Sequence, residues 1–411
     1  DGSLRGSFHN PDVNWTGRAP WFRVVEKEGS LELIDPATGK TRFVQPYDKN
    51  QQQIAMDFGT PIALTPRAGE TAVGFQPRTP AQTAYRYRVP LARGDGWKTA
   101  RARDVGLDEE RLRDLVQHLL AIDPADPNAP RVHSLLVARR GKLVLEEYFF
   151  GYSAERPHDL RSASKSLTSL MAGIAMDKPP SLTIDTPIAP SSTITLAHLL
   201  THSSGLACDD DDEQSPGNED VMQGQQKQRD WYRYFLDLPA AHAPGTKYAY
   251  CSAGINFAGG MIAKASGAWL PEFFDRHIAR PMQIERYHVN LMPDGQGYSG
   301  GGIYMRPRDF LKFGPLMLGG GTWNGTRIVS RQWVEASTAH RIATSSGGSD
   351  GYAWHRYKLG GYEEYEASGN GGQFLIVVPE LDLAVVFTAG NYGQYRVWKT
   401  FREELVRFML R

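Results

Sequence analysis

The sequence predicts a mixed α/β fold, in which helices pack on a sheet and a helical segment is inserted between the strands. Long apolar, strand-like runs lie at residues 134–151 and 371–391. The residues between them show mainly helical patterns, and further amphipathic patterns precede the first run and close the chain. Strand runs on both sides of a helical middle are typical of one sheet with a helical insertion.

Residues 1–95 have a different character and are predicted to form a β-rich extension without chemistry of its own. They are rich in Pro, Gly, Thr and aromatic residues, with short alternating runs. The stretch "SLELIDPATGKTRFVQ" predicts two strands around a Pro/Gly turn. We therefore expect residues 96–411 to form the main domain.

The main domain is predicted to open with a helix and a hairpin. The stretch "GLDEERLRDLVQHLLA" repeats its leucines with helical spacing, and Asp108 is a suitable N-cap. The stretch "SLLVARRGKLVLEEYFFG" then predicts two apolar strands that turn at Arg140 and Gly141. The apolar stripe in "LTSLMAGIAM" predicts a buried helix that begins near Ser162.

The second half is predicted to contain a helical subdomain, a hairpin and a closing helix. Helical patterns broken by polar loops occupy about residues 175–290. The stretch "GGQFLIVVPELDLAVVFTAGN" predicts two strands around residues 379–382. The closing helix carries one apolar face, formed by Val397, Phe401, Leu405 and Phe408.

Composition excludes several kinds of partner and site. The 411 residues carry 46 basic and 46 acidic side chains and no long basic run, so nucleic acid and anionic membrane surfaces are not expected as partners. No apolar stretch reaches the ~20 residues of a membrane-spanning helix. The two cysteines, Cys208 and Cys251, cannot form a zinc cluster alone. The opening "DGSLRG" lacks a methionine and predicts a processed or trimmed N-terminus.

The stretch "RSASKSLTSL" carries the first candidate for chemistry. Ser162 and Lys165 share a face of a helix, which brings the lysine amine within reach of the serine hydroxyl. The hydroxyl becomes a strong nucleophile when a base takes its proton, and a buried lysine with a lowered pKa is such a base. A chain of this size contains about one S-x-x-K by chance, and "SAS" also suits plain helix capping. The motif therefore needs support from other motifs.

Further motifs in the expected order give that support. "PGTKYAYCSAGIN" places Tyr250–Ser252 after a Pro-Gly turn, and "YEASGNGGQFLIVVP" places Ala367–Gly369 before a strong strand. Two more segments match in order. One is "LAHLLTHSSGL", which lies before the tyrosine motif, and the other is "SGGGIYMRPRDFLKFG", which lies between the tyrosine motif and the third motif. The sequence resembles the serine β-lactamase-like family, which includes class C β-lactamases, D,D-peptidases, related esterases and nylon-oligomer hydrolases such as 6-aminohexanoate-dimer hydrolase. The resemblance covers about residues 97–411.

The resemblance implies a site and a mechanism. Ser162 would be the acylated nucleophile, Lys165 its base or pKa-lowering partner, and Tyr250 the residue that passes a proton to the leaving group. The backbone N–H groups of Ser162 and Asn370 would form the oxyanion hole. Ser252, Ser368 and Gly369 would help to bind a small ester, amide or peptide. No metal or organic cofactor is implied.

Two departures from the family pattern bear on the substrate. Ser252 stands where the tyrosine motif of the family has asparagine. Ala367 stands where β-lactamases have a lysine that helps to bind the substrate carboxylate, and where esterases often have histidine. The absence of that lysine favours an esterase or amidase. A β-lactamase or D,D-peptidase is the alternative, and a catalytically silent binding protein on the same fold is the alternative of another class.

The resemblance also implies a more detailed fold and a compartment. It implies an antiparallel sheet with helices on both faces, an all-helical subdomain and a site between them. The segments of Cys208 and Cys251 lie near the active site in the family fold, so a disulfide between them is predicted, with two buried free thiols as the alternative. A disulfide would place the protein in the periplasm or outside the cell, because disulfides persist there.

Three remaining patterns allow a functional and a structural reading. G-x-S-x-G occurs at residues 297–301 and 347–351, but neither copy follows an apolar strand, as a nucleophile elbow requires. His202 is either catalytic or braces its loop, and bracing is favoured. The acidic run at residues 209–213 is read as a solvated loop, because a calcium loop has spaced ligands and a glycine turn.

Overall fold

The computed structural model describes residues 5–6, 22–36, 38–51, 53–57, 61–64, 77–78, 84–123, 126, 128–177 and 182–409. Within this part of the chain, no helix is both long enough and apolar enough to cross a membrane.

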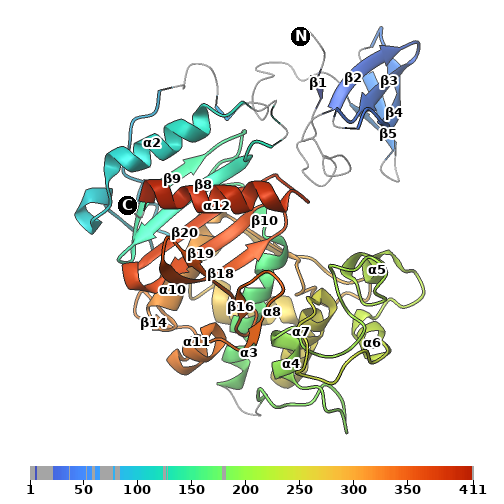
Figure 1. Ribbon diagram of the computed structural model, residues 1–411, viewed down its shortest axis with the longest axis vertical. Coiled ribbons are helices and arrows are strands. Elements are labelled where there is room, and N and C mark those ends of the chain that lie inside the picture. The colour runs from blue at the N-terminus through green and yellow to red at the C-terminus, as the bar shows by residue number, and fades with distance from the viewer. Residues whose placement is uncertain are drawn as a thin grey trace.

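A nine-stranded sheet forms the centre of the molecule (Figure 1). All its neighbouring strands pair antiparallel except the short edge strand β7, which lies parallel to β9. In spatial order the strands are β15 (Ile342–Ala343), β16 (Ser349–Asp350), β17 (His355–Leu359), β18 (Tyr362–Gly369), β19 (Gln373–Val378), β20 (Leu383–Ala389), β8 (Val132–Arg139), β9 (Lys142–Tyr148) and β7 (Lys98–Thr99).

Both predicted hairpins are present at the centre of this sheet. β8 and β9 turn at Arg140 and Gly141, which have φ angles of 53° and 69°. β19 and β20 turn through the short 3-10 segment η5 (Pro379–Leu381) and Asp382, with φ of 47°. β20 then pairs with β8, which joins residues far apart in the sequence into one continuous sheet.

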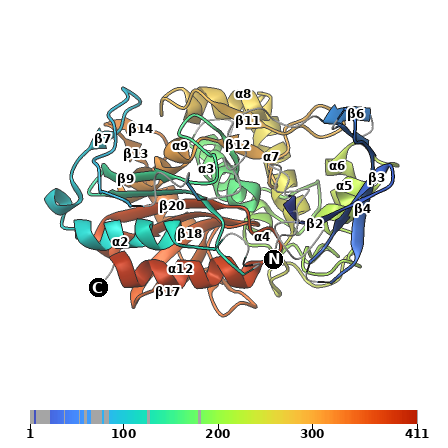
Figure 2. The ribbon, with the colours of Figure 1, turned by 90° about the horizontal axis from the view of Figure 1, so that it is seen from above.

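Helices cover both faces of the sheet, as Figure 2 shows from above. One face packs against α2 (Glu109–Leu120) and α12 (Tyr395–Met409), and the core there includes Leu112, Ile376 and Phe401. The other face packs against α3 (Ser164–Met176), α9 (Pro307–Leu311) and α10 (Phe313–Leu318). Because successive strand residues point to opposite faces, Leu375 and Val377 belong to the second core while Ile376 belongs to the first. The predicted fold class is confirmed.

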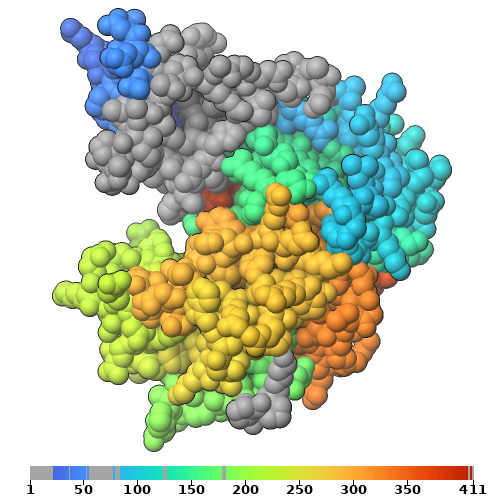
Figure 3. All heavy atoms as spheres, turned by 180° about the vertical axis from the view of Figure 1, so that it is seen from behind, coloured from blue at the N-terminus to red at the C-terminus, as the bar shows by residue number. Residues whose placement is uncertain are grey.

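The chain between α3 and the later strands is largely helical. Its elements are α4 (Leu196–Leu200), α5 (Glu219–Gly224), α6 (Trp231–Leu236), α7 (Ser252–Ser266), α8 (Leu270–Phe274) and η4 (Asp275–Ala279). A small three-stranded sheet contains, in spatial order, β10 (His158–Asp159), β12 (Ile303–Met305) and β11 (Tyr287–Val289). The segment from α7 to β12, coloured yellow to light orange, forms the middle of the face drawn in Figure 3.

The remaining elements of the main part are short. They are η2 (Ala102–Val105), the hairpin of β13 (Thr322–Trp323) and β14 (Thr326–Arg327), and α11 (Arg331–Thr338).

The first strands form a six-stranded sheet with a small core of its own around Phe22, Leu31 and Leu33. The predicted hairpin appears here as β3 and β4, with residue 37 outside the described residues. In spatial order the strands are β1 (Arg5–Gly6), β2 (Phe22–Lys27), β3 (Ser30–Ile34), β4 (Thr41–Asp48), β5 (Gln53–Asp57) and β6 (Pro61–Leu64).

Candidate active site

Ser162 lies in a 3-10 turn, η3 (Arg161–Ala163), that leads directly into α3. Arg161 has a φ angle of 50°, a left-handed conformation that is uncommon for a residue other than glycine. Such a conformation costs about 1–3 kcal/mol and persists where the surrounding structure holds it. Here the Arg161 N–H donates to Oδ1 of Asp159 at 2.9 Å. The turn leaves the Ser162 side chain half-buried at the start of a fully buried helix.

Lys165 contacts the Ser162 hydroxyl from the first turn of α3. Its Nζ donates to Ser162 Oγ at 2.9 Å and also to the carbonyl oxygen of Gly300. The lysine is only 3% exposed. Burial lowers the pKa of Lys165 below its ordinary value, although the nearby carboxylates of Glu219 and Asp210 act in the opposite direction. A lowered pKa makes a neutral amine, which can accept a proton, more accessible near neutral pH.

Tyr250 contacts the same hydroxyl. The Ser162 side chain is close enough to its phenol group to lower the pKa of Tyr250. The Lys165 Nζ lies 4.9 Å from the centre of the tyrosine ring, so the lysine and the tyrosine both lie beside Ser162. Burial raises the pKa of Tyr250 well above its ordinary value, and the neighbouring Ser162 side chain only partly offsets this effect. The phenol is therefore neutral at neutral pH and able to donate its proton.

His202 braces the Tyr250 loop. Its Nδ1 accepts the N–H of Cys251 at 3.1 Å, and its ring centre lies 4.6 Å from that of Tyr250. Burial lowers the pKa of His202 to about 3, so the ring is neutral and can accept this hydrogen bond. A disulfide between Cys208 and Cys251 ties the same loop to the segment after α4.

Two carboxylates support the site, and neither was identified from the sequence. Asp210 accepts the N–H groups of Glu219 and Ser252, each at 2.8 Å. Burial raises the pKa of Asp210 to about 6, and the charge of Glu219 acts in the same direction. Glu219 in turn accepts the hydroxyl groups of Ser252 and Tyr298. These bonds fasten the beginning of α7, and with it the Tyr250 loop, to the acidic run and to the start of α5.

This network corrects two expectations from the sequence. The acidic run is not uniformly solvated, because Asp209 and Asp210 are half-buried while residues 211–213 are exposed. Ser252 is not open to a substrate, because it is 0% exposed and its hydroxyl bonds to Glu219. Gly300, to which no chemistry was assigned, also belongs to the site through its bond to Lys165. The consecutive glycines at residues 300–302 are the sequence signal that points to this close approach.

The third motif lies beside the nucleophile turn. A side chain at Gly369 would place its Cβ 2.3 Å from the backbone oxygen of Leu160, so only glycine allows β18 to approach η3 this closely. Asn370 follows directly, and its side chain accepts the N–H of Gly393 at 2.8 Å. Within the described residues the Asn370 N–H has no acceptor. Ser368 is half-buried on the same strand end.

The two G-x-S-x-G copies lack the setting of a nucleophile elbow. Ser299 is 1% exposed, and its hydroxyl donates to the backbone oxygen of Ile255 at 3.3 Å. Ser349 lies in the two-residue strand β16, which no helix follows directly. Neither serine is therefore a nucleophile elbow at a strand-to-helix turn.

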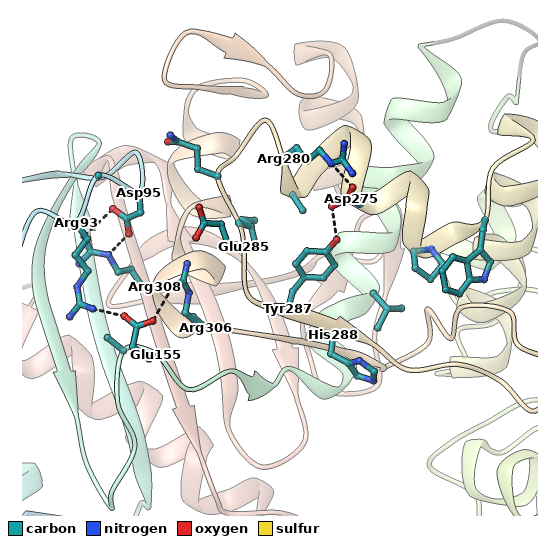
Figure 4. Close-up of a pocket in the computed structure, with 18 of the residues that line it drawn as sticks. Arg93, Asp95, Glu155, Asp275, Arg280, Glu285, Tyr287, His288, Arg306 and Arg308 are labelled. Carbon is teal, nitrogen blue, oxygen red and sulfur yellow. Dashed lines mark hydrogen bonds and ion pairs between the residues drawn. The ribbon is translucent and has the colours of Figure 1, made fainter.

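A separate pocket of about 960 Å³ lies away from this serine site (Figure 4). Ser162, Lys165 and Tyr250 are not among its lining residues. Its charged side chains largely neutralise one another in the pairs Arg93–Glu155, Arg308–Asp95 and Arg280–Asp275. Chemistry that needs an activated nucleophile is therefore supported at Ser162 and not in this pocket.

The chain is similar to several known proteins. The sequence matches the family model described as "Beta-lactamase" over residues 113–402. It is 25% identical over 288 residues to 6-aminohexanoate-dimer hydrolase from Paenarthrobacter ureafaciens, a match that covers 62% of this chain and 71% of that protein.

Solved structures share the fold at low sequence identity. The octameric penicillin-binding protein homologue from Pyrococcus abyssi has a TM-score of 0.58 and 19% identity, covering 73% of this chain and 77% of its own. EstCE1, a hydrolase with promiscuous acyltransferase activity, has a TM-score of 0.56 and 15% identity, covering 72% of this chain and 98% of its own. Because the family match spans well over half of the chain, the protein belongs to the β-lactamase family.

Proposed function

We propose that the protein is a serine hydrolase that cleaves an ester or amide bond through an acyl-enzyme on Ser162. The observation that carries this proposal is the meeting of Lys165 Nζ and the Tyr250 phenol at the Ser162 hydroxyl. A hydroxyl with a buried amine at 2.9 Å and a second proton carrier nearby has the groups that nucleophilic catalysis requires. Family membership supports the same reaction class.

In the acylation step, Lys165 takes the proton of Ser162 Oγ as this oxygen attacks the substrate carbonyl carbon. The negative charge that develops on the carbonyl oxygen is stabilised by the backbone N–H groups of Ser162 and Asn370. When the tetrahedral intermediate collapses, Tyr250 donates its proton to the leaving group and regains one from Lys165. Water then attacks the acyl-enzyme by the reverse sequence of proton transfers and frees Ser162.

Several observations favour a linear ester or amide as the substrate. Ala367 supplies no cation at the position where the family β-lactamases have lysine, so a β-lactam carboxylate lacks that partner. The relative from Paenarthrobacter is, by its name, a hydrolase of the 6-aminohexanoate dimer. β-Lactamase or D,D-peptidase activity is the second candidate, supported by the likeness in fold to a penicillin-binding protein homologue.

The disulfide also supports a location outside the cytoplasm. Cys208 and Cys251 are both buried, with exposed fractions of 2% and 3%, and are joined to each other. Structural disulfides persist in the periplasm and in secreted proteins, whereas cytoplasmic thiols are kept reduced. We therefore propose a periplasmic or secreted enzyme.

The proposal predicts that a fluorophosphonate probe labels Ser162. Only this hydroxyl is bonded to a buried lysine amine, so it should react much faster than other serines of the described chain. Peptide mapping after labelling identifies the modified residue, and the Ser162→Ala variant should lose both labelling and ester hydrolysis. Labelling at Ser299 or Ser349 would contradict the proposed nucleophile.

Substrate preference gives an independent expectation. With Ala367 in the third motif, p-nitrophenyl acetate should have a higher kcat/KM than a cephalosporin. Spectrophotometric assays of the two compounds with the same preparation measure this ratio. A clear preference for the cephalosporin would favour the second candidate, a β-lactamase.

A further inference from the structure

His355 is a histidine of the serine site that no motif identified. It is the first residue of β17, and its ring centre lies 6.3 Å from that of Tyr250. The charge of Lys165 is close enough to oppose protonation of His355. His355 therefore lies near the same tyrosine and lysine that contact the Ser162 hydroxyl.

Asp350 fixes how this imidazole is oriented. His355 Nδ1 lies 2.7 Å from Oδ1 of Asp350, a carboxylate with 0% exposure. A carboxylate accepts a hydrogen bond, so Nδ1 carries a proton and Nε2 points away from Asp350. Within the described residues Nε2 has no hydrogen-bond partner, and the side chain is 17% exposed. Nε2 is thus available to a ligand.

The surroundings of His355 also favour its positively charged form. Burial lowers the pKa of His355, and so does the charge of Lys165. The charge of Asp350 and its hydrogen bond outweigh these effects, so that the pKa lies above its ordinary value. A charged imidazole donates from Nε2, and hydrogen bonds from a charged donor to a carboxylate are among the stronger ones.

The sheet register shows where this donor lies relative to the third motif. His355 is opposite Glu366, the residue before Ala367, on the strand next to β18. Neighbouring strands are about 4.8 Å apart, and the three steps along the strand from Glu366 to Gly369 span about 10 Å. Gly369 touches the nucleophile turn. A carboxylate bound at His355 would therefore lie farther from the scissile carbonyl than one bound at position 367.

We propose that His355, oriented by Asp350, is a specificity-determining residue whose Nε2 binds a carboxylate of a linear substrate several bonds from the scissile carbonyl. This inference rests on the proposed hydrolysis at Ser162 and narrows its substrate class. It gives the site a cationic contact from the strand next to the third motif. Because this carboxylate site lies farther from the scissile carbonyl than position 367, it suits an extended, flexible acid better than the compact ring of a β-lactam.

Matched pairs of esters test this assignment. The first pair is mono-p-nitrophenyl adipate and its methyl ester, which differ only in the charge at the far end of the acyl group. The second is 3-(4-acetoxyphenyl)propanoate and its methyl ester, which place the same difference on the leaving group. For at least one pair, His355→Gln should lower the kcat/KM ratio of acid to methyl ester by about tenfold or more, the worth of one charged hydrogen bond. The kcat/KM values for the methyl esters should change much less in His355→Gln.

Two further variants distinguish recognition from mere support. His355→Lys restores a cation on the same strand and should recover a large part of the preference for the acid. His288→Gln alters an exposed histidine that lines the separate pocket of Figure 4, and it should leave both ratios unchanged. Equal losses for acid and methyl ester in His355→Gln, without rescue by lysine, would overturn the proposal. Unchanged ratios of acid to methyl ester in His355→Gln would also overturn the proposal, provided that Ser162 is labelled normally. Absent labelling of Ser162 would instead refute the proposed function.

Discussion

Replacement of Lys165 by methionine should slow acylation of Ser162 by about two orders of magnitude or more, the usual worth of positioned acid–base catalysis. The amine lies 2.9 Å from the serine hydroxyl, and no other side-chain nitrogen is hydrogen-bonded to that hydroxyl within the described residues. Methionine has a similar volume and is apolar, so it suits a position that is 3% exposed. The fold should be retained while the base is lost.

Rapid mixing with p-nitrophenyl acetate measures the acylation rate directly, and thermal unfolding checks the fold. Tyr250→Phe should give a comparable loss on an amide, because the leaving amine then lacks its proton donor. On an activated ester the loss should be smaller, since p-nitrophenolate leaves without a proton. Near-full acylation rates for Lys165→Met, with an intact fold, would show that another group takes the serine proton.

The pH dependence of acylation should identify Lys165 as that group. A base must be neutral to accept a proton, so the rate rises as the pH rises through the pKa of Lys165. Burial lowers this pKa, and Glu219 is the strongest of the influences that raise it. Glu219→Gln removes that charge and should shift the rising limb to lower pH. Glu213→Gln, at an exposed position of the acidic run that precedes α5, serves as the matched control and should leave the limb in place.

The parts of the site that could be predicted from sequence are those encoded within a few residues. Ser162 and Lys165 are three positions apart, and helix geometry alone brings them together. The hairpins of β8–β9 and β19–β20 follow from apolar runs around short turns. The family resemblance added Tyr250, which no local pattern connects with Ser162.

The supporting residues could not be predicted because only the folded chain brings them together. Asp210 bonds to a backbone N–H that is 42 residues away in the sequence. In the sequence it is one of four consecutive aspartates, which look like a solvated loop. His355 lies near Tyr250 although the two are far apart in the sequence, and the neighbouring Asp350 gives no motif. Ser252 was assigned to the substrate from its place in a motif, and only its burial against Glu219 shows a supporting role.

Loss of the disulfide is the change with the largest expected effect on stability. The bond between Cys208 and Cys251 closes a loop with a sequence separation of 43, and loop-closure entropy assigns such a bond about 4 kcal/mol of stabilisation. That value is a large fraction of the roughly 5–15 kcal/mol that stabilises an ordinary folded domain. Breaking the bond should therefore lower the free energy of unfolding markedly.

Two single variants separate the bond from the local contacts of each cysteine. Cys251 Sγ also accepts the N–H of Gly254 at 3.1 Å at the beginning of α7, and serine keeps an acceptor there. Cys208→Ala and Cys251→Ser should each lose about 4 kcal/mol in denaturant unfolding. The double variant should be little worse than either single one, because the same bond is lost in all three. Wild-type protein unfolded with reductant should match them.

The same variants should also affect catalysis, because the bond holds the loop that carries Tyr250. His202 and Asp210 still fasten that loop after the bond is broken, through the N–H groups of Cys251 and Ser252. Ester hydrolysis at low temperature should therefore persist, with a loss far smaller than that of Lys165→Met. Unchanged stability in both single variants, together with two alkylatable thiols in unreduced, exported protein, would contradict the disulfide and remove the main support for a location outside the cytoplasm.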